Sequence, residues 1–482
     1  MGTGFSFTSQ LASQFISLAV LVALYRWVPR EDFGLIAAAQ LLVMLPRTFL
    51  TLGLNIAGIQ REQLELPHLR GLFWWNLSLG AIASFVTAIC VPLVATWKQS
   101  EDLSRIGYAL SGTAVVAALG MAHQTLLERE LRFPALQTIR LVSQLAAGLI
   151  AIGIASQGGG AWALVAQSYL ELFFIACGCM RTAWFWPGSP RSMREAFSLL
   201  RFGGMYGLIS MLFYLSQNLD KFLLYAFLPN SEIALAVFGM YQQAFNWMMR
   251  PVLGVTTPVS SVMLPALSRV QNDRSLFQKL AIDFYRLVAL LLIPCGFGAF
   301  LVAEDAMLTA GGSTWRDAGI LLRALSPVIL LQGFVNISGS VFTASNQLRA
   351  MAIAAAWLLV LQTQGLLAGY WFGSRIDRDP LSIAEGMAWG YSITTACVVG
   401  LPYLWFCCRM TMVSFASLVK AITTPVWASS VMAVAVWYLN RAMTPDVAAP
   451  IRLCAAISLG VAIYGWLARR PLREMIRNFG SA

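Results

Sequence analysis

Two arginines lie near the middles of long apolar stretches of this sequence. Arg47 and Arg250 are 203 residues apart, and each follows a glutamine, Gln40 or Gln243, by seven positions. A guanidinium group keeps its charge and is costly to place in hydrocarbon, so two of them at matching depth predict a polar cavity between two related halves. Such a cavity suits an anionic substrate, because phosphate and carboxylate oxygens accept the paired hydrogen bonds of a guanidinium group.

Further polar residues follow the arginines at helical spacing. Asn246 lies four positions before Arg250, and Gln217 lies in another apolar stretch. Similar stripes run through two more stretches: Ser6, Gln10, Ser13 and Ser17, and Gln332, Asn336 and Ser340. Several such stripes indicate either a shared aqueous lumen or hydrogen bonds that join helices. The arginines favour the lumen, whereas the serines and amides fit both interpretations.

Two acids, Glu171 and Asp220, also lie well inside apolar stretches. A carboxyl group in a medium of low dielectric constant can carry a proton, bind Na⁺ or neutralise an arginine, and the sequence leaves these alternatives open. Lys221, next to Asp220, either pairs with it or extends toward the membrane surface. The cysteines have no histidine or cysteine companions at zinc spacing, so we expect no metal and no organic cofactor.

The elements that position these residues are predicted to be membrane-spanning helices. Hydrophobic residues make up 58% of the chain and charged residues 11%. Because a helix needs roughly 20 apolar residues to cross a bilayer, the chain reads as an all-α integral membrane protein. The apolar runs predict about fourteen transmembrane helices: 5–27, 33–59, 71–96, 106–127, 135–155, 161–183, 202–227, 235–264, 280–303, 318–344, 350–372, 384–406, 415–439 and 451–468.

The distribution of basic residues predicts the topology. Loops after even-numbered spans and the adjoining span ends, with the C-terminal tail, carry 18 lysines and arginines, against 9 in loops after odd-numbered spans and their adjoining span ends. Lysine and arginine are retained on the inner side, so both termini should be cytoplasmic. The net charge of +11 then follows mostly from topology, and we expect no nucleic-acid partner.

Weak internal similarity divides the chain into two parts. Ser13-Gln14 and Ser216-Gln217 share the offset of the arginines, and Phe33-Gly34 corresponds to Phe238-Gly239. The repeat predicts two parallel six-helix lobes related by an axis along the membrane normal. The expected order is an N-terminal lobe (1–183), a cytoplasmic linker (184–201), a C-terminal lobe (202–410), and two additional transmembrane helices with a basic cytoplasmic tail (411–482).

An ordered set of short segments resembles the Wzx-like polysaccharide flippases of the MOP superfamily, in its polysaccharide transporter group. The segments are 26–40, 52–62, 73–80, 127–133, 160–167, 218–228, 238–245 and 259–273. The resemblance implies that the lobes form a V-shaped cleft in the bacterial cytoplasmic (inner) membrane. It also implies movement of a polyprenyl-diphosphate-linked oligosaccharide from the inner to the outer leaflet by alternating access, for O-antigen, capsule or exopolysaccharide export. Membrane lipid, a polysaccharide polymerase and a chain-length regulator are the implied partners.

On this interpretation the lumen is lined by Arg47, Arg250, Gln40, Gln243, Asn246 and Gln217, and Na⁺ or H⁺ at Asp220 or Glu171 drives transport. Two alternatives come from the same superfamily, a MATE-like drug exporter and a lipid II-type transporter. The first would favour acids in its lumen, and the second is compatible with fourteen spans. A membrane glycosyltransferase or polymerase is the enzyme alternative. We expect no enzyme, because the loops predicted to be external are short.

The charge distribution makes a testable prediction about orientation. In a cysteine-free variant, a cysteine placed at Ser313 should react with a membrane-impermeant thiol reagent added from outside, and one at Ser189 should react only after the membrane is permeabilised. The opposite labelling pattern would reverse the predicted topology.

Overall fold

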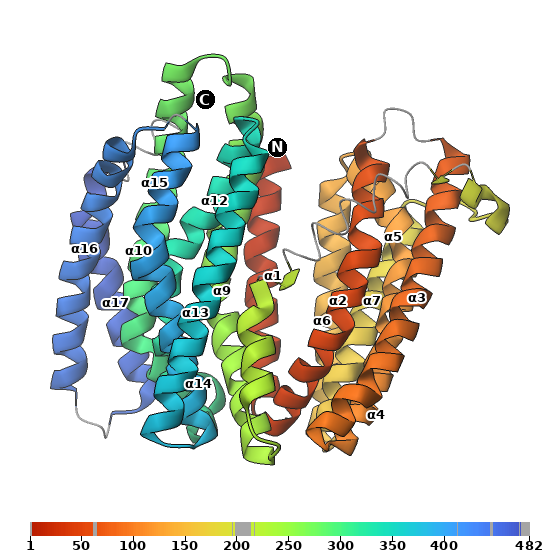
Figure 1. Ribbon diagram of the computed structural model, residues 1–482, viewed down its shortest axis with the longest axis horizontal. Coiled ribbons are helices and arrows are strands. Elements are labelled where there is room, and N and C mark those ends of the chain that lie inside the picture. Colours follow the sequence, from red (N-terminus) through yellow and green to blue (C-terminus); the bar gives the residue numbers. More distant parts are fainter. Residues whose placement is uncertain are drawn as a thin grey trace. The chain divides into compact units, whose positions relative to one another are not determined.

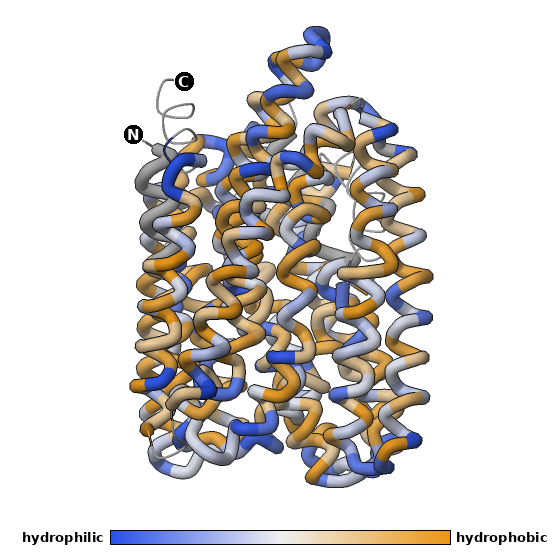
Figure 2. Tube along the Cα trace, turned by 90° about the vertical axis from the view of Figure 1, so that its left-hand side faces the viewer, coloured by the Kyte–Doolittle hydropathy of each residue, from blue (hydrophilic) through white to orange (hydrophobic). Residues whose placement is uncertain are grey.

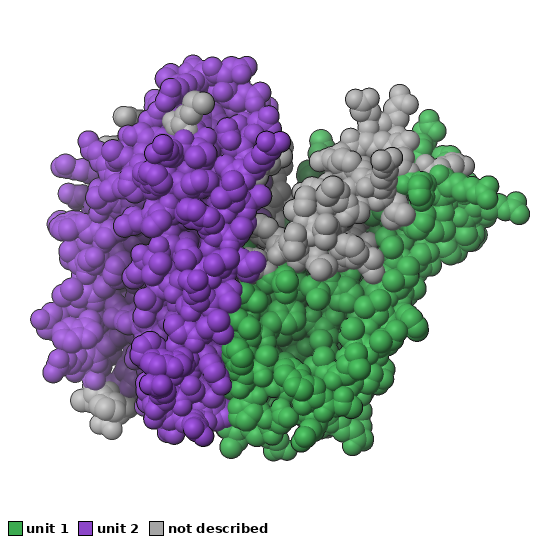
Figure 3. Space-filling model, in the orientation of Figure 1, with its two compact units in different colours: residues 1–239 green, residues 240–482 purple. Residues whose placement is uncertain are grey.

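The chain folds into two compact units, residues 1–239 and 240–482 (Figure 3). The computed structural model describes residues 2–60, 65–194, 196–197, 214–215, 217–411, 413–443, 447–471 and 473. Each unit is described by itself below. The predicted V-shaped cleft and the predicted lobe boundaries stay predictions.

The first unit is a bundle of helices (Figure 1). Its helices are α1 (Gly2–Leu24), α2 (Arg30–Gln60), α3 (Leu66–Lys98), α4 (Glu101–Ser111), α5 (Thr113–Arg129), α6 (Phe133–Ser156) and α7 (Ala161–Thr182), followed by the 3-10 helix η1 (Pro190–Arg194). α1 packs on α6, α6 on α7, and α2 on α3, while α5 contacts both α3 and α7. Residues 217–227 are also helical. The first part of the predicted seventh span, and the end of the predicted linker, lie outside the described residues.

The second unit begins inside α9 (Glu232–Arg269). It continues with α10 (Arg274–Gly311), η2 (Ser313–Trp315), α11 (Arg316–Leu325), η3 (Ser326–Val328), α12 (Ile329–Ala344), α13 (Leu348–Ile376), α14 (Pro380–Ile393), the π-helical η4 (Thr394–Val399), α15 (Gly400–Thr411), α16 (Phe415–Ala442) and α17 (Ala449–Leu467). α10 is central to the unit, since it contacts α11, α12, α16 and α17.

Several helices begin at a side chain that caps the first turn. Asp273 precedes α10, and its carboxylate accepts hydrogen bonds from the backbone N–H groups of Ser275 and Leu276, both at 3.0 Å. The hydrogen bond from Leu276, with those from Ser275, lowers the pKa of this carboxyl group. Ser100 caps α4 and Asp379 caps α14 in the same way. Short polar residues at these positions explain where the apolar runs become helical.

The helices agree with the predicted spans. Within the described residues, eleven helices are long and apolar enough to cross a membrane. α1, α2 and the helical segment 217–227 coincide with the other three predicted spans. Most strongly hydrophilic residues lie near the helix ends (Figure 2). The prediction of an all-α integral membrane protein with about fourteen helices is therefore confirmed. The predicted ends are less accurate, because α9 and α10 have 38 residues each and extend beyond the apolar runs.

Two arginines within helices, Arg140 of α6 and Arg323 of α11, each pair with a glutamate. Arg140 lies 3.4 Å from Glu128, and Arg323 lies 3.0 Å from Glu304 on α10. A neighbouring acid lowers the cost of a charge near the end of a span.

Within the first unit, the start of α2 crosses the start of α9 at two glycines. A Cβ atom on Gly239 would lie 2.6 Å from the backbone nitrogen of Gly34 and 2.5 Å from the carbonyl oxygen of Arg30. A Cβ atom on Gly34 would overlap the carbonyl of Leu235. Only glycine allows the two backbones to approach this closely. Phe33-Gly34 and Phe238-Gly239 are the pairs that the sequence repeat had matched.

The hairpin of α13 and α14 in the second unit is also packed through glycine residues. Gly365, Gly369 and Gly373 on α13 face Gly386 and Gly390 on α14, and a Cβ atom on Gly386 would lie 2.5 Å from the carbonyl oxygen of Gly369. We call these five residues the glycine seam. Beyond it, the buried Gln362 donates a 3.3 Å hydrogen bond to Thr395 in η4.

The last two helices are held on α10 by polar contacts as well as apolar packing. Arg452 at the start of α17 forms an ion pair with Asp305. Asn440 of α16 donates to the carbonyl oxygen of Leu301 at 3.1 Å, and Tyr464 of α17 donates to that of Leu290 at 2.7 Å. The two additional helices are thus an integral part of the second unit.

The glycine seam makes a prediction about stability. Gly386→Ala forces a methyl group against the α13 backbone, so we expect the free energy of unfolding to fall by about 1–3 kcal/mol, as in other overpacked cores. Gly298→Ala on α10 is the matched control, because nothing lies within 4 Å of its added Cβ atom. It should be neutral or stabilising by up to about 1 kcal/mol. Thermal unfolding in detergent measures both, and equal melting temperatures would show that the seam is not tightly packed.

Candidate functional site

A polar cavity inside the first unit brings together three of the residues singled out in the sequence. Its volume is about 210 Å³, and Gln40 and Arg47 of α2 line it together with Glu171 of α7. The remaining lining residues are Val43, Met44, Leu110, Thr113, Ser168 and Leu172. Gln40 and Arg47 reach the same cavity because seven residues make two helical turns. A cation, an acid and several neutral polar groups therefore share one space among apolar helices.

The walls of the cavity are fixed by hydrogen bonds to backbone carbonyls. The Thr113 hydroxyl donates to Leu110 at 2.5 Å, and that of Ser168 donates to Leu164 at 2.9 Å. With their protons engaged, both hydroxyl oxygens keep lone pairs to offer as acceptors. Sequence reasoning missed both residues. Ser168 could have been found, because it lies one turn before Glu171 on the same helix face.

Tyr169 connects the cavity helix α7 to the end of α4. Its hydroxyl donates a 2.5 Å hydrogen bond to the carbonyl oxygen of Ala109. A Cβ atom on Gly112 would lie 2.5 Å from the same hydroxyl, so the break between α4 and α5 needs a glycine. This contact holds the turn of α7 that carries Glu171 against the end of α4.

The two candidate acids differ in their surroundings. Glu171 forms no hydrogen bond or ion pair with any residue that the structure describes, and it faces the cavity. Asp220 lies 3.9 Å from the Lys221 ammonium group, and the side chains of both are at most 4% exposed. Lys221 also donates to Asn218 at 2.9 Å. The ion-pair alternative for Lys221 is therefore confirmed, whereas a coupling role for either acid stays a prediction.

The predicted site residues of the second unit follow one stretch of α9. Gln243 is buried, and Arg250 is half-buried two turns later. Asn246 accepts a 3.2 Å hydrogen bond from Gln242. Gln217, which belongs to the first unit, is half-buried on the helical segment 217–227. The expectation that these residues and Arg47 line one common lumen stays a prediction.

Several neutral polar residues of the predicted stripes join helices. Ser13 of α1 donates to Gln144 of α6 at 2.8 Å. In the second unit Gln332 donates to Asn336 at 3.1 Å, and Asn336 donates to Thr256 of α9 at 3.3 Å. Ser13 and Asn336 therefore join helices, whereas Gln332 is bonded within α12. The side chains of Ser6 and Gln10 lie outside the described part.

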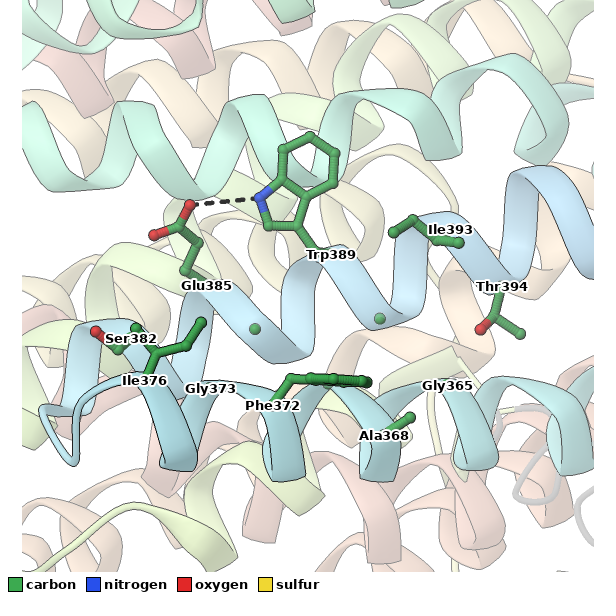
Figure 4. A pocket seen from close by; sticks show the side chains of 13 residues that line it. Gly365, Ala368, Phe372, Gly373, Ile376, Ser382, Glu385, Trp389, Ile393 and Thr394 are labelled. Atoms are coloured by element: carbon green, nitrogen blue, oxygen red, sulfur yellow. Dashed lines mark hydrogen bonds between the residues drawn. The ribbon is translucent and has the colours of Figure 1, made fainter.

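A second concavity has a different character (Figure 4). It follows the glycine seam of α13 and α14, has a volume of about 450 Å³, and carries exposed apolar side chains such as Phe372, Ile376 and Ile393. Its one acid, Glu385, accepts a 3.3 Å hydrogen bond from the Trp389 indole. This groove has no cation in its lining and differs in that respect from the cavity at Arg47.

Comparison with protein families decides the classification. The model of the family described as "Polysaccharide biosynthesis protein" matches residues 23–320, well over half of the chain. The chain belongs to this family. This membership confirms the resemblance of its short segments to the polysaccharide flippases.

Three relatives are similar over most of this chain. The lipopolysaccharide biosynthesis protein WzxC of Escherichia coli is 25% identical over 68% of this chain and 66% of its own length. The succinoglycan biosynthesis transport protein ExoT of Rhizobium meliloti is 25% identical over 98% and 93%. The teichuronic acid biosynthesis protein TuaB of Bacillus subtilis is 22% identical over 87% and 84%.

Solved structures support the fold. A lipid II flippase, MurJ, in an inward closed conformation superposes with a TM-score of 0.72 at 14% identity, over 97% of this chain and 99% of that one. An inward-facing MATE family transporter of the MOP superfamily gives a TM-score of 0.63 at 14% identity, over 87% and 99%. At these identities the likeness concerns the fold alone.

Proposed function

We propose that this protein is a flippase that moves a polyprenyl-diphosphate-linked oligosaccharide from the inner to the outer leaflet of the bacterial cytoplasmic membrane. The observation that carries the proposal is the position of Arg47, at a polar cavity among membrane-spanning helices, in a member of the polysaccharide biosynthesis protein family. Relatives named for lipopolysaccharide, succinoglycan and teichuronic acid biosynthesis support a saccharide cargo. Both termini would be cytoplasmic, and the protein would act as a transporter and not as an enzyme.

Arg47 would bind the diphosphate or an acidic sugar during passage. The guanidinium fork matches two oxygens of a phosphate, and its charge balances part of the charge that must cross the membrane. Gln40, Thr113 and Ser168 would offer hydrogen-bonding groups to sugar hydroxyls. Arg250, with Gln243 and Asn246, would contact the same substrate from α9, and Gln217 would complete this lining. The polyprenyl tail would stay in the lipid, because apolar chains gain nothing by entering a polar cavity.

The site chemistry discriminates against a MATE-like exporter of cations. Arg47 and Arg250 would repel a cationic drug, whereas they attract phosphate. A lipid II-type transporter shares both the fold and the need for cations, so the saccharide must be identified by the lipid-linked intermediate that accumulates when the gene is deleted. A polymerase and a chain-length regulator are the partners that we expect to consume the flipped product.

The arginines provide the first test of this function. A charge-assisted hydrogen bond contributes about 1.5–3 kcal/mol, so Arg47→Ala or Arg250→Ala should slow flipping in proteoliposomes by about ten- to hundredfold. Arg47→Lys should restore only part of the rate, because an ammonium group lacks the fork. Arg105→Ala is the control, since this exposed residue pairs only with Glu101 and Asp102 near a helix end. Unchanged flipping in both alanine variants would remove the arginines from the transport path.

We also propose that Glu171 couples transport to an ion gradient, by binding H⁺ or Na⁺ when Arg47 is without substrate. It is favoured over Asp220, which already pairs with Lys221. A carboxylate beside Arg47 would compete with the substrate anion for the guanidinium group. Neutralising that carboxylate with a cation would therefore change the affinity of the cavity for substrate.

Glu171→Gln tests the coupling directly. In proteoliposomes the variant should flip at one rate whether or not a pH or Na⁺ gradient is imposed, because its amide takes up no proton and offers Na⁺ no negative charge. Glu128→Gln is the matched control in the same unit and should keep the response to the gradient. The gradient that accelerates the wild-type protein identifies the ion. A Glu171→Gln variant that responds like the wild type would make this acid a counter-charge for Arg47 only.

A further inference from the structure

The segment that follows α7 packs against α3, at the end of the first unit where α7 ends and α3 begins (Figure 1). We call residues 183–194, with Ala196 and Phe197, the collar. Three side chains of α3 donate hydrogen bonds to collar carbonyls: Arg70 to Trp186 (3.0 Å), Trp74 to Pro187 (3.3 Å) and Trp75 to Met193 (2.9 Å). The collar is therefore a docked element of the first unit, and most of it belongs to the predicted linker (184–201).

Two apolar contacts complete the docking. Phe185 is buried, and its ring stacks on His123 of α5 with centroids 4.3 Å apart. Gly71 of α3 faces the carbonyl of Ser192, and a Cβ atom at this glycine would lie 2.5 Å from the Cβ atom of Ala196. One face of the collar is thus fixed by α3 and α5.

The other face of the collar carries large aromatic side chains. Trp184, Trp186 and Phe197 are 63%, 65% and 60% exposed, respectively. An aromatic side chain in this segment can be buried, as shown by Phe185, which lies between Trp184 and Trp186 in the sequence. Alternation of buried and exposed rings along an extended segment indicates that the outward face is built for an apolar or interfacial environment.

Three arginines accompany these rings. Arg181 lies in the last turn of α7, next to the collar, and Arg191 and Arg194 belong to η1. All three are exposed, and their side chains form no hydrogen bond or ion pair with any residue that the structure describes. The surface therefore combines aromatic rings that suit the membrane interface with exposed cations that can bind anions there.

We infer that the collar is an interfacial anchor that binds the anionic phospholipid headgroups of the membrane leaflet at this end of the protein. Its rings would lie at the depth of the headgroups, where tryptophan is favoured, and its arginines would contact lipid phosphates. The collar starts one residue after a membrane-spanning helix ends at Thr182, so it is held at the boundary between hydrocarbon and water. A water-soluble partner protein is less well matched, because the rings follow directly after a membrane-spanning helix.

Quenching of tryptophan fluorescence by brominated lipids measures the proposed contact. Full-length protein is reconstituted in mixtures of phosphatidylcholine and phosphatidylglycerol in which one lipid, the other lipid or neither carries bromine on its acyl chains. The difference between the wild type and W184F/W186F isolates the signal of the two collar tryptophans. We expect both lipids to quench it, with phosphatidylglycerol preferred over phosphatidylcholine by roughly tenfold or more, given the contribution of each cation near an anionic surface. High salt should reduce the preference.

Charge variants separate the collar from the rest of the surface. R181E/R191E/R194E should lose the preference for phosphatidylglycerol, whereas R349E/R409E/R469E, which changes the net charge equally with exposed arginines of the second unit, should keep it. Tryptophans that neither lipid quenches would place the collar in water and favour a protein partner. Equal quenching by both lipids, or a preference insensitive to salt in the wild type, would also overturn the inference, even if the charge variants failed to fold.

Discussion

Direct contact between backbones at glycine residues is the constraint on which both units depend. Apolar side chains gain little by leaving lipid for a protein interior, so helices in a membrane must be held by close packing and hydrogen bonds. The seam of α13 and α14, the crossing of α2 with α9, and the docking of the collar on Gly71 each place a carbonyl where a Cβ atom would otherwise be. These helix pairs therefore pack closely without polar side chains at the glycine contacts.

The crossing at Gly34 and Gly239 also gives physical meaning to the internal repeat. The sequence matched Phe33-Gly34 with Phe238-Gly239 as equivalent positions, and the structure brings the two glycines into contact within the first unit. Each glycine is required for the same reason, because a Cβ atom on either one would overlap the backbone of the other helix. The two parallel lobes that the repeat implies stay a prediction.

The sequence predicted what depends on local apolar content and missed what depends on distant partners. Runs of apolar residues located the spans, and helical spacing placed Gln40 and Arg47 on one face of α2. Nothing local shows that the indoles of Trp74 and Trp75 donate to carbonyls more than a hundred residues later. The docked collar, like the pairing of Asn440 with α10, was therefore outside the reach of pattern alone. Thr113 was missed because it meets Arg47 only through packing between helices.

The polar stripes show which kind of residue carries functional information in a membrane helix. Neutral side chains satisfy one another across helices, as Ser13 does with Gln144 and as Asn336 does with Thr256. Each such bond pairs a donor with an acceptor, and no charged group is placed in the membrane. A guanidinium and a carboxylate cost far more to hold in hydrocarbon. Arg47 and Glu171 both line the polar cavity of the first unit. A stripe with a charge that lines a cavity is thus a candidate for the substrate path, whereas a stripe whose neutral side chains bond across helices is a helix contact.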